Sequence, residues 1–309
     1  MIRFECDYAE GAAPQLLERL TRTNLEQTPG YAVDGHCQRA RDLIRAACAA
    51  PQAEVEFLVG GTQANQTVIS AALRPYQGAL CAQTGHINVH ETGAIEATGH
   101  KVLPLPSQDG KITPKQVEQF CAVHWADPTR EHIVQPGMVY LSQPTETGLL
   151  YTRTELEGFR AVCDRYGMYL YIDGARCGYG LAAPESDVDL TDLARLTDVF
   201  YIGGTKVGGR FGEAAVFTKH NRPRYFSTIA KQHGALLAKH LTGAGQKCGD
   251  VIAGKKCVAL GVGHAVKAAA GIAARGVGRH SFVCSSLSVI CGVGVGCAAG
   301  LGGVWDITR

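Results

Sequence analysis

Short apolar segments alternate with amphipathic segments over the first 240 residues of this 309-residue chain. Helical spacing of apolar positions predicts helices over residues 14–24, 38–49, 113–123 and 153–166, and another from the 60–62 turn to residue 73. Apolar runs predict strands over residues 54–59, 79–82, 101–105, 138–142, 168–172, 199–202 and 214–218. Strands that alternate with helices indicate an α/β fold, with a mostly parallel sheet covered on both faces.

The composition changes abruptly near residue 240. Residues 241–309 hold 7 Lys/Arg against 2 Asp/Glu and 15 of the 38 glycines. Gly-Val and Gly-Ala runs break helices and weaken strands, so we expect one domain over residues 1–239 and a poorly ordered tail over residues 240–309. The uncharged segment 281–305 has the length of a membrane span, but its density of glycine argues against one. A tail-anchored membrane protein is therefore the alternative, and we expect no membrane contact.

Charge and cysteine usage narrow the function classes. A formal net charge of +2 gives no reason to propose a nucleic acid partner. The 12 cysteines form no CxxC pair and no zinc-finger spacing, so they are interpreted as small buried hydrophobic residues of a cytoplasmic protein. The first residues resemble neither a signal peptide nor a transit peptide.

Two polar residues stand directly after predicted strands. Lys206 follows the strand at 199–202 and lies among glycines, where desolvation lowers the pKa of an amine and makes it a nucleophile toward carbonyls. Asp173 ends the strand at 168–172, where its carboxylate can hold a positive charge. In parallel sheets, ligands bind at the carboxyl ends of the strands. A lysine for a Schiff base and an acidic partner for a pyridinium nitrogen together predict a pyridoxal phosphate (PLP) site.

A glycine turn is the candidate phosphate site. Gly60, Gly61 and Thr62 follow the strand at 54–59 and open a helix, whose free N–H groups can bind a phosphate. The alternative is an ordinary glycine turn, but its place at a third strand end favours the phosphate site.

Three other polar residues complete the candidate site, and each has an alternative interpretation. His86 can stack on the cofactor ring; with His90 it could also form a metal pair, but no third ligand is evident, so we expect no metal. Arg176 can grip a carboxylate, or form a surface salt bridge. Glu146, in the turn after the strand at 138–142, is a general base or part of a polar turn.

The ordered set of these motifs resembles the threonine aldolase / β-eliminating lyase family, which are PLP-dependent enzymes of fold type I. The resemblance rests on residues 4–8, 30–34, 60–65, 86–93, 145–148, 173–176 and 203–206, and it covers about residues 1–239. It implies a homodimer or homotetramer. The small C-terminal domain of the family is missing or aberrant here, and a shifted reading frame or an aberrant exon is our hypothesis for the tail.

The resemblance also implies a role for each site residue. Lys206 would bond covalently to PLP, Asp173 would pair with the ring nitrogen and His86 would stack on the ring. Gly61 and Thr62 would hold the phosphate, Gly60 and Thr205 would also bind the cofactor, and the substrate would bind at Arg176 and Asp7. Many family members have a histidine where this chain has Glu146.

The reaction expected from these roles is cleavage of the Cα–Cβ bond of a β-hydroxy-α-amino acid to glycine and an aldehyde. Two alternatives remain open at this point. One is β-elimination from an amino acid with a leaving group on Cβ. The other is a non-catalytic remnant that keeps the cofactor pocket but has lost the closing domain.

Overall fold

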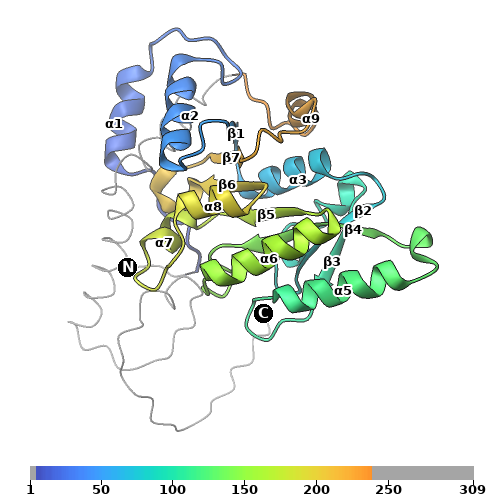
Figure 1. Ribbon diagram of the computed structural model, residues 1–309. Coiled ribbons are helices and arrows are strands. Elements are labelled where there is room, and N and C mark those ends of the chain that lie inside the picture. Colours follow the sequence, from blue (N-terminus) through green and yellow to red (C-terminus); the bar gives the residue numbers. More distant parts are fainter. Residues whose placement is uncertain (1–4, 239–309) are drawn as a thin grey trace, which may run out of the picture.

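The computed structural model describes residues 5–238, which form one three-layer α/β unit (Figure 1). Its sheet consists of β1 (Glu54–Leu58), β2 (Gln77–Ala82), β3 (Lys101–Leu105), β4 (Gln135–Ser142), β5 (Tyr169–Asp173), β6 (Val199–Gly203) and β7 (Glu213–Phe217). The strand order is β1-β7-β6-β5-β4-β2-β3. Strand β7 is antiparallel to β1 and β6, and every other pair is parallel. The mixed, mostly parallel sheet confirms the expected fold.

Helices cover both faces of the sheet. They are α1 (Pro14–Thr23), α2 (Gly35–Ala47), α3 (Gly61–Ala72), α4 (His86–Val89), α5 (Pro114–Ala126), α6 (Arg153–Tyr166), α7 (Cys177–Ala182), α8 (Leu190–Leu196) and α9 (Phe226–Gln232). Short 3₁₀ turns lie at Glu96–Thr98 and Arg130–His132, and a π-turn lies at Thr205–Gly209. In Figure 1, α5 and α6 lie side by side on one face of the sheet and α3 lies on the other.

Alternate residues of each strand feed two separate cores. In β4, Val139 and Leu141 pack with α5, α6 and α8, whereas Met138 and Tyr140 pack with α3 and α9. Successive side chains of a strand point to opposite faces, and a strand covered on both faces is therefore apolar throughout. This double coverage explains the uninterrupted apolar runs that identified the strands in the sequence.

The ends of several elements differ from their predicted bounds by a few residues. The second helix begins at Gly35 because the Asp34 carboxylate accepts a hydrogen bond from the N–H of Cys37 and caps it. Strand β7 begins at Glu213, opposite Leu58 and Gly203, although a charged residue looked like part of the preceding turn. Helices α7, α8 and α9 are short, and the apolar periodicity did not reveal them.

Both expectations about the tail, poor order and an absent membrane helix, concern residues 240–309, which lie outside the described residues. Within residues 5–238, no helix combines the length and the apolarity that crossing a membrane requires.

The direction of the strands gathers the loops of the site. Strands β1, β2, β4, β5 and β6 run the same way, so their carboxyl ends share one edge of the sheet. The backbones of the segments after β5 and β6 are in close contact at this edge. A Cβ on Gly174 would lie 1.8 Å from the carbonyl oxygen of Tyr201, and a Cβ on Gly203 would lie 2.5 Å from that of Ala175.

The close approach at Gly174 predicts that even a methyl group destabilises the protein. Gly174→Ala should lower the free energy of unfolding by about 1–3 kcal/mol or more, because the backbone of β6 must move. Gly35→Ala is the matched control, since a Cβ at this helical position meets no atom within 4 Å. Chemical denaturation of both variants checks this. Equal stability of the two variants would show that the contact is not tight.

Candidate active site

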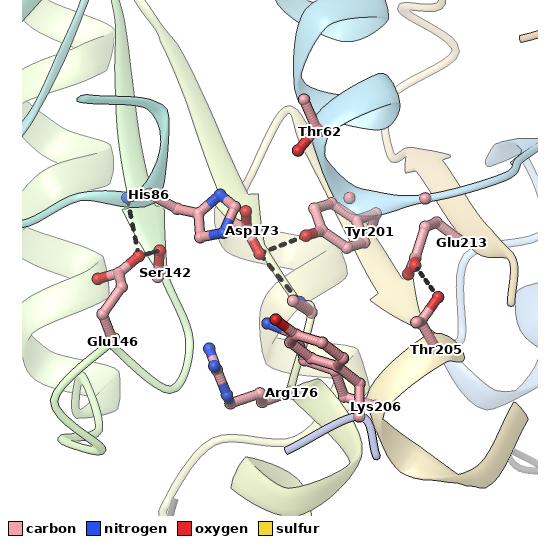
Figure 2. Close-up of a pocket in the computed structure, with 14 residues that line it drawn as sticks. Thr62, His86, Ser142, Glu146, Asp173, Arg176, Tyr201, Thr205, Lys206 and Glu213 are labelled. Carbon is pink, nitrogen blue, oxygen red and sulfur yellow. Dashed lines mark hydrogen bonds between the residues drawn. The ribbon is translucent and has the colours of Figure 1, made fainter. Parts of the chain in front are cut away.

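A cavity of about 260 Å³ opens at the carboxyl edge of the sheet (Figure 2). Nine of the residues singled out in the sequence line it: Gly60, Gly61, Thr62, His86, Glu146, Asp173, Arg176, Thr205 and Lys206. Asp7 reaches the same place through its contacts with Arg176 and Lys206. Residues that are up to 199 positions apart in the chain therefore meet in one pocket.

Lys206 stands on the π-turn that follows β6 and points into the pocket. Its side chain is 14% exposed. Burial and then the positive charge of Arg176 lower the pKa of the Lys206 amine, while the carboxylates of Asp7 and Asp173 act in the opposite direction. Asp7 Oδ1 is 3.9 Å from Lys206 Nζ. A larger fraction of this amine is consequently unprotonated and nucleophilic at neutral pH than of an ordinary lysine.

Asp173, the last residue of β5, is a buried carboxylate with four hydrogen-bond donors. Tyr201 donates to Oδ1 and Tyr140 donates to Oδ2, each at 2.5 Å. The N–H of Ala175 donates to Oδ1 and the side-chain amide of Asn65 donates to Oδ2, each at 2.9 Å. Such a set of donors fixes the orientation of the carboxylate and offsets the cost of its burial.

His86 begins α4 and pairs with a buried glutamate. Its Nδ1 lies 2.7 Å from Glu91 Oε1. Burial lowers the pKa of His86, but the hydrogen bond to Glu91 and the carboxylates of Asp173 and Glu91 outweigh this and raise it. Asn65 donates to Glu91 as well as to Asp173, so one amide joins the two acidic groups.

Glu146 connects two loops at the mouth of the pocket. Its Oε1 accepts hydrogen bonds from the N–H of His86 at 3.0 Å and from Ser142 Oγ at 2.6 Å. The carboxylate therefore orders the start of α4, and Glu146 is also one of the residues that line the pocket (Figure 2). Its role as a general base stays a prediction.

An anion site is formed where α3 begins. The N-cap Gly60 supplies no side-chain hydrogen bond, so the first N–H groups of this 12-residue helix have no capping partner. Thr62 and Thr205 bring hydroxyl groups to the same cavity. Free amides and hydroxyls at a helix N-terminus suit a phosphate group.

Arg176 already holds a carboxylate in this structure. Its Nε donates to Oδ2 of Asp7, and both side chains are mostly buried, at 18% and 8% exposure. Burial alone lowers the pKa of Arg176, but the Asp7 carboxylate outweighs this and raises it. The contact shows that Arg176 can take a carboxylate at this depth, and it makes Asp7 a neighbour of the predicted substrate position.

Several polar residues of the site escaped sequence analysis. Tyr140 and Tyr201 lie within the apolar strand segments, and Asn65 lies in the 60–65 segment without a role assigned to it. Glu91 and Glu213 lie just outside predicted elements, and their burial had no sequence signal. His90 is exposed, with its ring 5.5 Å from that of His86. Residues 5–238 contain no group of three or more potential metal ligands.

Comparison with known proteins agrees with this geometry. A family model described as beta-eliminating lyase matches residues 6–278. The low specificity L-threonine aldolase of Pseudomonas aeruginosa is 32% identical over 240 residues, which is 77% of this chain and 68% of that protein. A solved structure of Leishmania major threonine aldolase is 42% identical with a TM-score of 0.81, covering 89% of this chain and 80% of that one.

A more distant solved structure shares only the fold. The PLP-bound C-S lyase of Staphylococcus hominis is 12% identical, with a TM-score of 0.62, and the match covers 86% of this chain and 67% of that one.

The position of Arg176 predicts a change in the acidity of Lys206. Arg176→Gln removes the positive charge that lowers the pKa of the amine, and it frees Asp7 to pair with the ammonium. Both effects favour the charged form, so the pKa of Lys206 should rise toward that of an ordinary lysine. Competitive acylation of cofactor-free protein across pH, read by mass spectrometry, measures this pKa.

Arg195→Gln is the control for that experiment. Arg195 is an exposed residue of α8 that pairs with Glu157 and Asp192. The Arg195→Gln substitution should leave the pH dependence of Lys206 acylation unchanged. A Lys206 profile that does not move in Arg176→Gln would contradict the electrostatic coupling.

Proposed function

The chain belongs to the beta-eliminating lyase family, and we propose that it is a PLP-dependent aldehyde-lyase. The substrate is a β-hydroxy-α-amino acid of the threonine type, which is cleaved between Cα and Cβ to glycine and an aldehyde. One observation carries the proposal: a lysine of lowered pKa and a fully hydrogen-bonded aspartate line one pocket that also contains an uncapped helix N-terminus. The names of the Pseudomonas and Leishmania relatives support the reaction.

The residues of the pocket fit PLP. Lys206 would bond to the aldehyde carbon, Asp173 would hold the protonated ring nitrogen and His86 would stack on the ring. The phosphate would lie against the N-terminus of α3, with the hydroxyls of Thr62 and Thr205 as donors. When bound, PLP supplies a conjugated ring that accepts the electron pair of the cleaved Cα–Cβ bond.

The chain itself orients the substrate and moves its protons. Arg176 binds the substrate carboxylate in place of Asp7, and this contact sets the orientation of the bond to be cleaved. The carboxylate of Glu146 takes the proton of the β-hydroxyl group as the aldehyde forms. The Asp173 carboxylate keeps its four donors throughout, so the positive charge it faces is stabilised without reorganisation.

Assembly and location are part of the proposal. Leu25 and Val33 are 89% and 71% exposed, which supports burial of the N-terminal region in a homodimer or homotetramer. All seven cysteines described by the structure are free, and most are buried, which supports a reducing cytoplasm.

β-Elimination is the second candidate, because the family is described by that reaction. It needs the same lysine and the same ring but a leaving group on Cβ in place of a hydroxyl. Acetaldehyde from L-threonine distinguishes the first reaction from pyruvate released from a cysteine conjugate in the second.

Lys206→Ala tests the central residue. The variant should lose turnover of L-threonine by on the order of 10³-fold or more, because the nucleophilic amine is absent. When the wild-type protein is incubated with PLP and reduced with borohydride, the cofactor should become irreversibly attached, and peptide mapping should find it on Lys206. Lys219→Ala is the control, since Lys219 is 43% exposed and pairs with Asp198 at the other end of the sheet.

Retention of turnover in Lys206→Ala, or a label on another lysine, would refute the assignment. Labelled wild-type protein that releases neither aldehyde nor pyruvate would instead support a non-catalytic remnant.

A further inference from the structure

Glu213 is a buried acid of the pocket that the proposed reaction does not use. It is the first residue of β7, where it pairs with Leu58 of β1 and Gly203 of β6. It is 2% exposed, yet it lines the cavity together with Gly61 and Thr205. Strand β7 runs opposite to its neighbours, so its first residue lies at the edge where theirs end. Glu213 therefore stands directly between the helix that starts at Gly61 and the turn that carries Lys206 (Figure 2).

The hydrogen bonds of Glu213 go to the two residues that precede Lys206. Its Oε2 accepts from the N–H of Gly204 at 3.2 Å, and its Oε1 lies 2.8 Å from Thr205 Oγ1. No Lys, Arg or His within residues 5–238 forms an ion pair with it; Lys206 pairs with Asp7 instead. A carboxylate buried without a counter-ion is costly, and it usually keeps its proton.

Some groups around Glu213 raise its pKa and others lower it. Burial, together with the carboxylate of Asp173 on β5, raises its pKa to about 8, against the hydrogen bonds from Thr205 and Gly204 and the charge of Lys206. The hydroxyls of Tyr171 and Tyr201 also face it, and burial keeps both pKa values well above the usual range. The turn from Gly60 to Thr62, on the β1 side, contributes no charge. Glu213 is therefore neutral at pH 7, and of these groups Lys206 is the other one whose pKa is moved toward neutral pH, because burial and Arg176 lower it.

The protonation state of Glu213 decides which hydrogen bond Thr205 can donate, because a hydroxyl group has a single hydrogen. When Glu213 is ionised, Thr205 must donate that hydrogen to Oε1, and only its lone pairs face the cavity. When Glu213 is protonated, its own O–H donates to Thr205 Oγ1. The hydrogen of Thr205 is then free to donate to an anion in the cavity.

We propose that Glu213 is a positioning residue that acts as a neutral acid, turning the Thr205 hydroxyl toward a phosphate group at the N-terminus of α3. The inference rests on the proposed function only in identifying this phosphate as that of PLP. Ionisation of Glu213 reverses the Thr205 hydrogen bond and adds a negative charge beside the anion site. Phosphate affinity is consequently full below pH 8 and falls as the pH rises through that value.

Glu213→Gln separates this role from simple packing. The glutamine oxygen can accept from the N–H of Gly204, and its amide can donate to Thr205 Oγ1, as the protonated glutamate does. Unlike glutamate, glutamine keeps this pattern at every pH. The variant should therefore bind phosphate with an affinity close to that of the wild type at pH 6.5 and hold this affinity to higher pH.

Calorimetric titration of cofactor-free protein with inorganic phosphate, from pH 6.5 to 9.5, tests the proposal. Relative to Glu213→Gln, the Kd of the wild type should rise above pH 8 by up to about tenfold per pH unit, the limit for one ionising group. The titration of phosphate itself is common to both proteins and cancels in the ratio. Glu118→Gln, an exposed change on α5, should follow the wild type. Parallel curves for Glu213→Gln and the wild type would overturn the proposal.

Thr205→Val keeps the proposal falsifiable if Glu213→Gln does not fold. Valine has the shape of threonine without its hydroxyl, so phosphate should bind about tenfold more weakly at pH 7. Unchanged affinity would show that Thr205 is not the donor and would overturn the proposal. The proposed function is tested separately by the borohydride label at Lys206. If the protein binds phosphate in this pH-dependent way but Lys206 is not labelled, the anion site exists and the proposed lyase function is wrong.

Discussion

The buried carboxylate of Asp173 is the interaction on which the pocket depends. Its donors come from α3 (Asn65), β4 (Tyr140), β6 (Tyr201) and the backbone after β5 (Ala175). Three elements are therefore anchored to one side chain at the centre of the carboxyl edge. Tyr140 and Tyr201 belong to the α3 core, Ala175 packs against it and Asn65 is fully buried, so the carboxylate cannot shift without disturbing the sheet. A fixed negative charge in a dry setting is what a protonated pyridine ring requires.

Glu213, the other buried acidic residue of the pocket discussed above, differs from Asp173 in its hydrogen bonding. Glu213 is as deeply buried as Asp173, but it has two hydrogen-bond partners where Asp173 has four, and its pKa is raised to about 8. Two carboxyl groups of one pocket thus differ in their hydrogen-bond partners. Asp173 faces the proposed position of the ring nitrogen, and Glu213 lies beside the proposed phosphate position. Strand direction and local donors, rather than residue type, separate the two roles.

Much of this arrangement could be predicted from the sequence, because apolar runs identified every strand and the residues after them were read as a site. Lys206, Asp173 and the Gly60–Thr62 turn follow strands whose ends must share an edge once the sheet is parallel. The antiparallel direction of β7 could not be predicted in this way, and Glu213 was missed with it. The tyrosines around Asp173 were missed because a strand residue shows its hydroxyl partner only after the chain has folded. The Arg176–Asp7 contact joins residues 169 positions apart and has no local signal.

The reversal of β7 also limits how the molecule can vary. The segment that carries the reactive amine connects β6 to β7. Its first end is fixed by the N–H of Gly203, which donates to the carbonyl oxygen of Gly174. Its second end is fixed by Glu213, which pairs with Gly203 of β6 and Leu58 of β1. One residue inserted into or deleted from it would move the amine out of its place beside Asp7. Most surface loops tolerate insertions and deletions, but the length of this loop is fixed by the position that the amine must take. Homologous chains should accordingly tolerate new side chains along it far more readily than a new number of residues.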